Sequence, residues 1–110
     1  MLDGPGVVLG VASLVLGEGM EQRHAELVVR AGVDAGAAAL DTARAYASVE
    51  DDAVGERLAV IAEERRPGIP VITKAGHYRL GTASWDADGS AARLRRDAER
   101  SVEVLGGPPA

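Results

Sequence analysis

The stretch from Ala37 to Tyr46 reads AAALDTARAY, an apolar run that ends at the carboxylate of Asp41. A second apolar run, from Pro70 to Thr73, is followed directly by Lys74. Short apolar runs bounded by turn residues are typical of buried strands. We therefore expect Asp41 and Lys74 each to lie at the end of a strand, where both face the same edge of a parallel sheet.

Strand and helix patterns alternate along the rest of the chain. The run Val7–Leu9 predicts the first strand, and Glu21–Ala35 predicts a helix that Gly36 ends. The apolar residues that recur at helical spacing in this first helix are Leu27, Val28, Ala31 and Ala35.

The two later helices carry clearer end signals. Ser48 is expected to cap the second helix, with the acidic run Glu50–Asp52 in its first turn, where negative charge complements the helix dipole. A loop is expected over Ala75–Gly89, and a third helix from Ser90 to Gly106. The apolar positions expected on the buried faces of these helices are Val54, Leu58, Ile61 and Ala62 in the second, and Leu94, Ala98, Val102 and Leu105 in the third.

Strands that alternate with helices, without hairpin signals between them, indicate βαβ units and a parallel sheet. Two architectures share this rhythm, the open doubly wound sheet and the closed eight-stranded barrel. The doubly wound fold predicts a glycine fingerprint after the first strand, but that turn reads Gly10-Val11-Ala12-Ser13-Leu14. Polar residues at consecutive strand ends favour the barrel. We expect an α/β fold, a partial (β/α)8 TIM barrel of about three N-terminal βα units with parallel strands.

The composition argues against several classes of function. With 110 residues the chain is one domain at most, and its net charge of -5 disfavours binding to nucleic acid or to an anionic membrane. No apolar stretch has the length of a membrane span. The lack of cysteine excludes disulfides and thiolate metal sites and fits a cytoplasmic protein. His24 and His77 are too far apart in sequence to predict a metal site.

Asp41, Tyr46 and Lys74 together predict carbonyl chemistry. A free tyrosine is a weak acid with a pKa of about 10. A protonated lysine beside a phenol stabilises the phenolate, and a carboxylate keeps that lysine charged and oriented. Taken singly, each residue type is more often structural, as a turn cap, a solvated lysine or a packing side chain. Their order and their strand-end positions favour a tyrosine that protonates a carbonyl oxygen as a hydride arrives.

The same residues resemble a known family, the aldo/keto reductases. The run Asp41-Thr42-Ala43 with Tyr46 is similar to the family's strand signature, and Thr73-Lys74 is similar to its lysine strand. Val54–Leu58 resembles its second helix, and Leu94–Asp97 resembles the helix before its fourth strand.

The resemblance implies a barrel that reduces aldehydes or ketones with NADPH as the cofactor. It implies Tyr46 as the general acid, Lys74 as the residue that tunes it, and Asp41 as the partner of Lys74. It places Ser13 and Asp41 near the cofactor and implies no metal. Residues 1–110 would be the N-terminal part of an aldo/keto reductase barrel domain, whose catalytic histidine and most NADPH contacts lie beyond them. We accordingly expect an incomplete, inactive fragment of an oxidoreductase with a small-molecule carbonyl substrate.

A function of another class remains open from the sequence. Three parallel strands cannot close a barrel, so an apolar sheet face and the sheet edges need other cover. The alternative is a non-catalytic half-barrel module that self-associates or binds another protein through the exposed sheet. A small doubly wound nucleotide-binding domain is disfavoured because the phosphate loop is missing.

Overall fold

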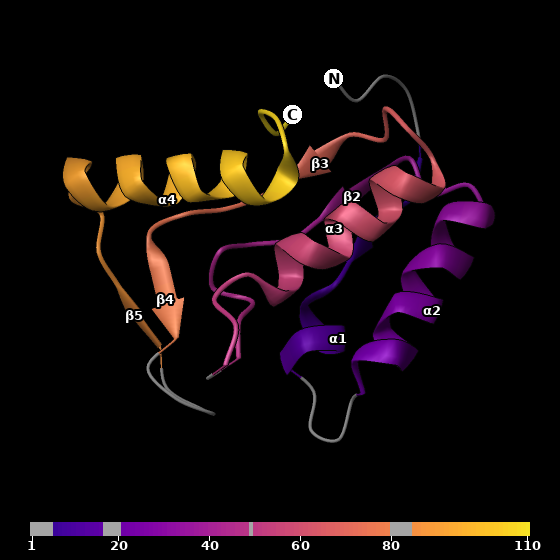
Figure 1. Ribbon diagram of the computed structural model, residues 1–110, viewed down its shortest axis with the longest axis horizontal. Coiled ribbons are helices and arrows are strands. Elements are labelled where there is room, and N and C mark those ends of the chain that lie inside the picture. The colour runs from indigo at the N-terminus through magenta and orange to yellow at the C-terminus, as the bar shows by residue number, and fades with distance from the viewer. Residues whose placement is uncertain (1–5, 17–20, 49, 80–84) are drawn as a thin grey trace.

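The structure is a computed structural model that describes residues 6–16, 21–48, 50–79 and 85–110. Its central sheet has three parallel strands in the order β1-β2-β3, and β4 and β5 form a separate antiparallel pair (Figure 1). The elements are β1 (Val8–Gly10), α1 (Ala12–Leu16), α2 (Gln22–Asp34), β2 (Ala39–Asp41), α3 (Val54–Arg65), β3 (Val71–Ile72), β4 (His77–Arg79), β5 (Trp85–Ala87) and α4 (Ala91–Leu105). The predicted alternation of parallel strands with helices is confirmed.

The register of the central strands decides where the polar strand ends meet. Asp41 pairs with Ile72, and Lys74 follows two residues later. Backbone hydrogen bonds continue this pairing past the strands, from Thr42 N to Ile72 O (2.8 Å) and from Arg44 N to Lys74 O (2.9 Å). Asp41 and Lys74 therefore lie at one edge of the sheet, as predicted.

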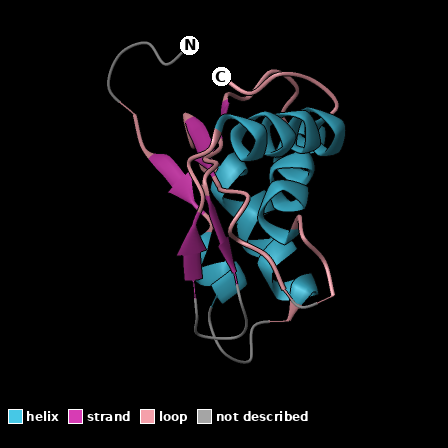
Figure 2. Ribbon diagram, turned by 90° about the vertical axis from the view of Figure 1, so that its left-hand side faces the viewer, coloured by secondary structure: helices cyan, strands magenta, loops and turns pink. Residues whose placement is uncertain are grey.

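The core lies between the central sheet and the helices, which gather on one side of the strands in Figure 2. Val11, Val29, Leu40 and Leu58 are each at most 1% exposed. Burial of each such side chain contributes about 1.5–3 kcal/mol. Because Leu40 directly precedes Asp41, the core anchors the end of β2 that carries the carboxylate.

Helix α2 forms where its apolar spacing predicts and ends before Gly36, whose φ of 100° suits glycine. It buries Ala25, Val29 and Val33, whereas Leu27 is 53% exposed. Both sets of residues recur at helical spacing, so spacing alone predicts the helix and not the face that packs on the sheet.

The buried face predicted for α4 is wrong at three of its four positions. The helix buries Asp97 and Ser101, while Leu94 is 40% exposed and Val102 42% exposed. The polar contacts of Asp97 explain this orientation of α4. Asp97 accepts hydrogen bonds from Arg93 Nε (3.0 Å) and from the backbone N of Gly76 (3.3 Å), and these bonds hold its side of the helix inward. Leu94, Ala98 and Val102 are therefore exposed, whereas Leu105, the fourth predicted position, packs against the core.

The two predicted serine caps have different outcomes. Ser90 caps α4 as predicted, because its Oγ accepts a hydrogen bond from Arg93 N (3.2 Å). Ser48 does not cap α3, which begins at Val54 and has no side-chain cap. Its Oγ instead accepts from Asp51 N (3.0 Å) and closes a turn before the helix. The acidic run therefore lies ahead of the first turn of α3, not within it.

The long loop predicted over Ala75–Gly89 is also wrong in part. His77–Arg79 and Trp85–Ala87 pair as an antiparallel ribbon, with residues 80–84 outside the described part of the chain. Tyrosine and tryptophan favour extended backbone, which is the local signal for this ribbon. The short helix α1 was not expected either. Within the described ranges, no helix is long and apolar enough to cross a membrane.

Candidate active site

Lys74 is fixed by two acceptors at the end of β2. Its ammonium group donates a hydrogen bond to Asp41 Oδ1 and a second one to the backbone oxygen of Thr42 (2.8 Å). The side chains of Lys74 and Asp41 are 49% and 40% exposed. A charged pair at this exposure adds little to stability, so its value lies in holding the ammonium group in one place.

Tyr46 completes the group of three. Lys74 Nζ lies 5.5 Å from the centroid of the Tyr46 ring, within the range of a cation–π contact. The carboxylate, the phenol ring and the ammonium group thus converge on one edge of the sheet, which is the predicted arrangement.

A hollow of about 290 Å³ adjoins this group. Three of its lining residues, Tyr46, Lys74 and His77, have side chains with polar groups, and the others are apolar: Leu16, Ala43, Ala45 and Ala75. A small apolar hollow with a few polar groups at one side is the usual form of a site for a small organic molecule.

The loop that carries Tyr46 is held against α3 by a glycine. Gly55 N donates to Tyr46 O (2.8 Å), and a Cβ at Gly55 would lie 2.5 Å from Thr42 Oγ1 and 2.7 Å from Tyr46 Cβ. Any larger residue at position 55 must push this loop away. The close approach of α3 therefore fixes the position of Tyr46.

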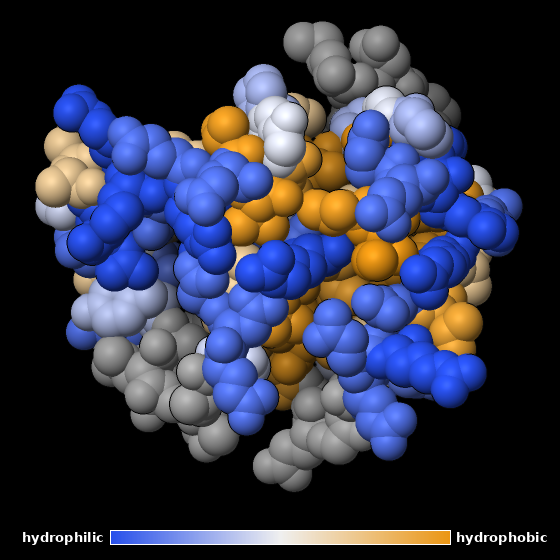
Figure 3. Space-filling model, viewed as in Figure 1, coloured by the Kyte–Doolittle hydropathy of each residue, from blue (hydrophilic) through white to orange (hydrophobic). Residues whose placement is uncertain are grey.

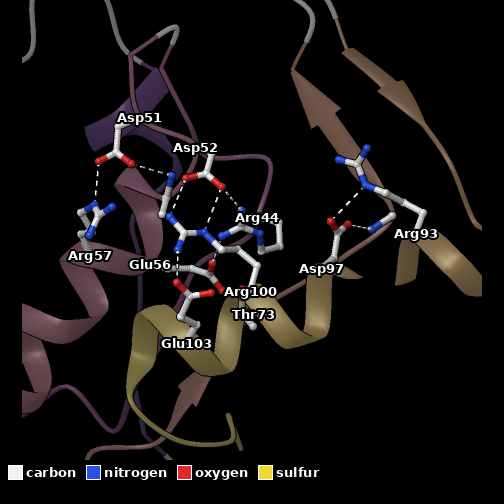
Figure 4. Close-up of polar contacts among 12 residues, drawn as sticks. Arg44, Asp51, Asp52, Glu56, Arg57, Thr73, Arg93, Asp97, Arg100 and Glu103 are labelled. Atoms are coloured by element: carbon white, nitrogen blue, oxygen red, sulfur yellow. Dashed lines mark hydrogen bonds and ion pairs between the residues drawn. The ribbon is translucent and has the colours of Figure 1, made fainter. Parts of the chain in front are cut away.

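A buried ion pair beneath the site was not predicted. Arg44 donates to Glu56 Oε1, and Glu56, which is 0% exposed, also accepts from Thr73 Oγ1 (3.1 Å) (Figure 4). Arg44 comes two residues before Tyr46, and Thr73 directly precedes Lys74. Glu56 thus ties together the two segments that bear the candidate catalytic groups. The sequence feature that could have indicated this pair is Glu56 itself, because α3 otherwise buries only apolar residues such as Leu58 and Ala62.

The acidic run before α3 forms specific ion pairs rather than a metal site. Asp51 accepts from Arg57 Nε (2.7 Å), and Asp52 bridges Arg44 (2.7 Å) and Arg100 (3.0 and 3.1 Å). The hydrogen bonds from Arg100 and then Arg44 lower the pKa of Asp52 to about 2, against the opposing effect of burial. Among the described residues, no group of three or more potential metal ligands is found.

Ser13 lies on the exposed side of α1 and is not among the residues that line the hollow. Its place near a cofactor stays a prediction. His77 is exposed and does line the hollow, at the start of β4.

The chain matches the aldo/keto reductase family model over residues 6–108. The chain belongs to the aldo/keto reductase family. At the sequence level, no curated protein gives a significant match.

Solved structures of aldo-keto reductases show the same fold. Two structures of a putative aldo-keto reductase from Pseudomonas aeruginosa are each 23% identical to the chain, with TM-scores of 0.72 and 0.68, and each covers 93% of it. An aldo-keto reductase from Bacillus halodurans, in its holo form, is 21% identical, with a TM-score of 0.67 and the same coverage. The chain spans 38%, 37% and 32% of these three proteins.

These likenesses confirm the predicted fold class, a partial (β/α)8 barrel with parallel strands. Membership of this family supports an oxidoreductase class of function.

Proposed function

We propose that this chain carries the proton-donating part of an NADPH-dependent aldehyde or ketone reductase. The single observation that carries the proposal is the convergence of Asp41, Tyr46 and Lys74 beside an apolar hollow. Family membership supports the reaction class, and the strand-end geometry supports the division of roles among the three residues.

Tyr46 acts as the general acid in this proposal. Its phenol gives a proton to the carbonyl oxygen of a substrate held in the hollow, and the alcohol product leaves a phenolate that takes a proton back from water. The Lys74 ammonium group, 5.5 Å from the Tyr46 ring centroid, stabilises that phenolate. Asp41 keeps Lys74 charged and in place through their hydrogen bond.

The described residues fit only the reacting end of the cofactor. A hollow of about 290 Å³ with mostly apolar lining residues accepts a flat ring or a small carbonyl compound beside Lys74, whose ammonium group donates a hydrogen bond to Asp41. When bound, NADPH supplies a hydride to the carbonyl carbon. Since the chain spans 32–38% of the similar reductase structures, we propose that residues 1–110 are the N-terminal part of the barrel domain and neither bind NADPH tightly nor turn over alone.

A chimaera tests the catalytic proposal. Residues 6–108 replace the matching third of an active aldo-keto reductase, and chimaeras that bind NADPH by fluorescence are assayed for aldehyde reduction. Tyr46→Phe should abolish turnover with NADPH binding unchanged, while the control Tyr78→Phe should keep it. An NADPH-binding chimaera that reduces aldehydes equally well with Phe at position 46 would refute the role of Tyr46. Micromolar NADPH binding by the 110-residue chain alone would refute the fragment proposal.

The second candidate is a non-catalytic half-barrel that associates through its uncovered apolar surface. Val7 on the approach to β1 is 77% exposed, and Leu94 and Val102 on α4 are 40% and 42% exposed. Figure 3 shows further apolar surface, in orange, along α3 between charged side chains. A sharp, discrete oligomer in analytical ultracentrifugation supports this candidate, whereas a monomer or polydisperse aggregates support the fragment.

A further inference from the structure

A buried carboxylate that the proposed reaction does not use lies behind the candidate active site. Glu56 on α3 is 0% exposed and does not line the hollow beside Lys74. Its two oxygens have different partners: Oε1 accepts from Arg44 Nη1, and Oε2 accepts from Thr73 Oγ1 (3.1 Å) (Figure 4). One carboxylate is therefore shared by two segments that are far apart in the sequence.

These two segments carry the candidate acid and its lysine. Arg44 precedes Tyr46 by two positions, and Thr73 is the neighbour of Lys74. Both candidate catalytic residues lie beyond the ends of β2 and β3. A backbone hydrogen bond from Arg44 N to Lys74 O (2.9 Å) still joins the segments there. The side-chain bridge through Glu56 adds a second connection at the point where the paired residues of the sheet have ended.

Stability gives no sufficient reason for a charged pair in this place. The Arg44 and Glu56 side chains are only 7% and 0% exposed, and the cost of taking two charges out of water can exceed the gain from their attraction. Apolar residues of similar volume often serve a fold equally well. The pair also leaves Arg44 Nε as a buried donor without a hydrogen-bond partner among the described residues. Directed hydrogen bonds, by contrast, define one arrangement of the two segments, which apolar contacts do not.

The guanidinium group of Arg44 is held from a second direction as well. Its Nη2 donates to Asp52 Oδ2 (2.7 Å), and Asp52 also accepts from Arg100 on α4 (3.0 and 3.1 Å). Charge-assisted hydrogen bonds to two carboxylates fix the orientation of the planar group. Arg44 therefore links the position of Glu56 on α3 to the loop that carries Tyr46.

We propose that Glu56 is a positioning residue for the proton donor. By holding Arg44 and Thr73 together, its carboxylate fixes how far the phenol ring of Tyr46 lies from the ammonium group of Lys74. This inference rests on the proposed function, in which that ammonium group, 5.5 Å from the ring centroid, stabilises the phenolate. The attraction between two charges falls as their separation grows, so a looser pair makes a weaker acid. Glu56 itself contacts no reacting atom.

Nuclear Overhauser contacts between the Lys74 side chain and the Tyr46 ring, measured in the labelled 110-residue chain, test the proposal. Thr73→Val removes one hydrogen bond to Glu56 with little change in volume and should weaken these contacts. Thr73→Ser keeps the hydroxyl and should restore them. Glu56→Gln, whose amide keeps one acceptor oxygen for two donors, should lose them.

Two further variants separate positioning from stability. Val29→Ala on α2, a helix that contributes no residue to the hollow, leaves a cavity in the core and destabilises the chain, yet should keep the contacts. The double variant Arg44→Met/Glu56→Met replaces the buried pair by apolar side chains. Its midpoint of urea unfolding should lie above that of Glu56→Gln, because no charge is left buried alone, while the contacts stay lost.

Contacts of wild-type strength in a folded Thr73→Val chain, or in the double methionine variant, would overturn the proposal, because the arrangement would then not need the bridge. Equal weakening in Val29→Ala or in Thr73→Ser would also overturn it, since a general loosening of the fold would be the cause. Failure of this inference differs from failure of the proposed function. The contacts report the arrangement of the two side chains without any turnover, whereas Tyr46→Phe in the chimaera tests the acid itself.

Discussion

Removal of the buried carboxylate of Glu56 is the most informative perturbation of this fold. Glu56 is fully buried and accepts from both Arg44 and Thr73, while the Arg44 side chain is only 7% exposed. Glu56→Gln keeps the size of the side chain but leaves the Arg44 charge with Asp52 as its remaining partner. Breaking a buried ion pair costs about 3–5 kcal/mol, and the remaining pair with Asp52 places the expected loss at the lower end, about 3 kcal/mol.

Such a loss lowers the melting temperature of a domain of this size by about 12 °C. The measurement is thermal and urea unfolding followed by circular dichroism. Arg65→Gln is the control, since Arg65 donates two hydrogen bonds to Asp34 (2.6 and 2.7 Å) in a pair whose side chains are both half exposed. The control should unfold like the wild type. If Glu56→Gln also unfolds like the wild type, the reasoning that Glu56 ties the two site segments together is wrong.

Three further predictions concern single positions. Gly55→Ala should lower the free energy of unfolding in urea by about 1–3 kcal/mol, because the new Cβ meets Thr42 Oγ1 at 2.5 Å. Gly89→Ala is the control and should be nearly neutral, because the space around Gly89 is open. Equal effects of the two variants would contradict the close packing of α3 on the Tyr46 loop. Gly106→Ala should lower the free energy of unfolding by about 1–2 kcal/mol because the φ of Gly106 is 77°, and Gly107→Ala should lower it by less. A neutral Gly106→Ala would contradict the left-handed end of α4. The pKa of Asp52 in the folded chain, about 2, lies below the ordinary value of 3.8 for an aspartate, so its contribution to stability is present above about pH 4 and is lost as the pH falls towards 2. Asp52→Asn should therefore lose stability at neutral pH and show a weaker acid dependence of the melting temperature. An unchanged acid profile would contradict the pairing with Arg100 and Arg44.

The sheet and the strand-end residues were predictable because they depend on local pattern. The run before Asp41 and the run before Lys74 are short and mostly apolar, and each is followed by a polar residue. Parallel pairing then brings their ends together. The caps at Ser90 and Gly106 are local in the same sense, since each depends on the conformation and contacts of a few neighbouring residues.

The remaining features depend on contacts between distant segments. The inward side of α4 is decided by Asp97, which meets Gly76 across 21 positions of sequence, and hydrophobic spacing cannot anticipate a helix that buries an aspartate. The pair of Arg44 with Glu56 joins a loop to a helix in the same way. Charged residues in a sequence are usually assigned to the surface, so a buried pair is visible only once the packing is known.

The central claim is that the groups of Asp41, Tyr46 and Lys74 meet at one edge of the sheet. Nuclear Overhauser contacts between the Lys74 side chain and the Tyr46 ring, measured in the labelled chain, test it most directly. With Lys74 Nζ 5.5 Å from the ring centroid, these contacts should be present in the wild type and weaker in Asp41→Asn, which loses the carboxylate that holds the lysine. A folded wild-type chain without any contact between these two side chains would contradict the account.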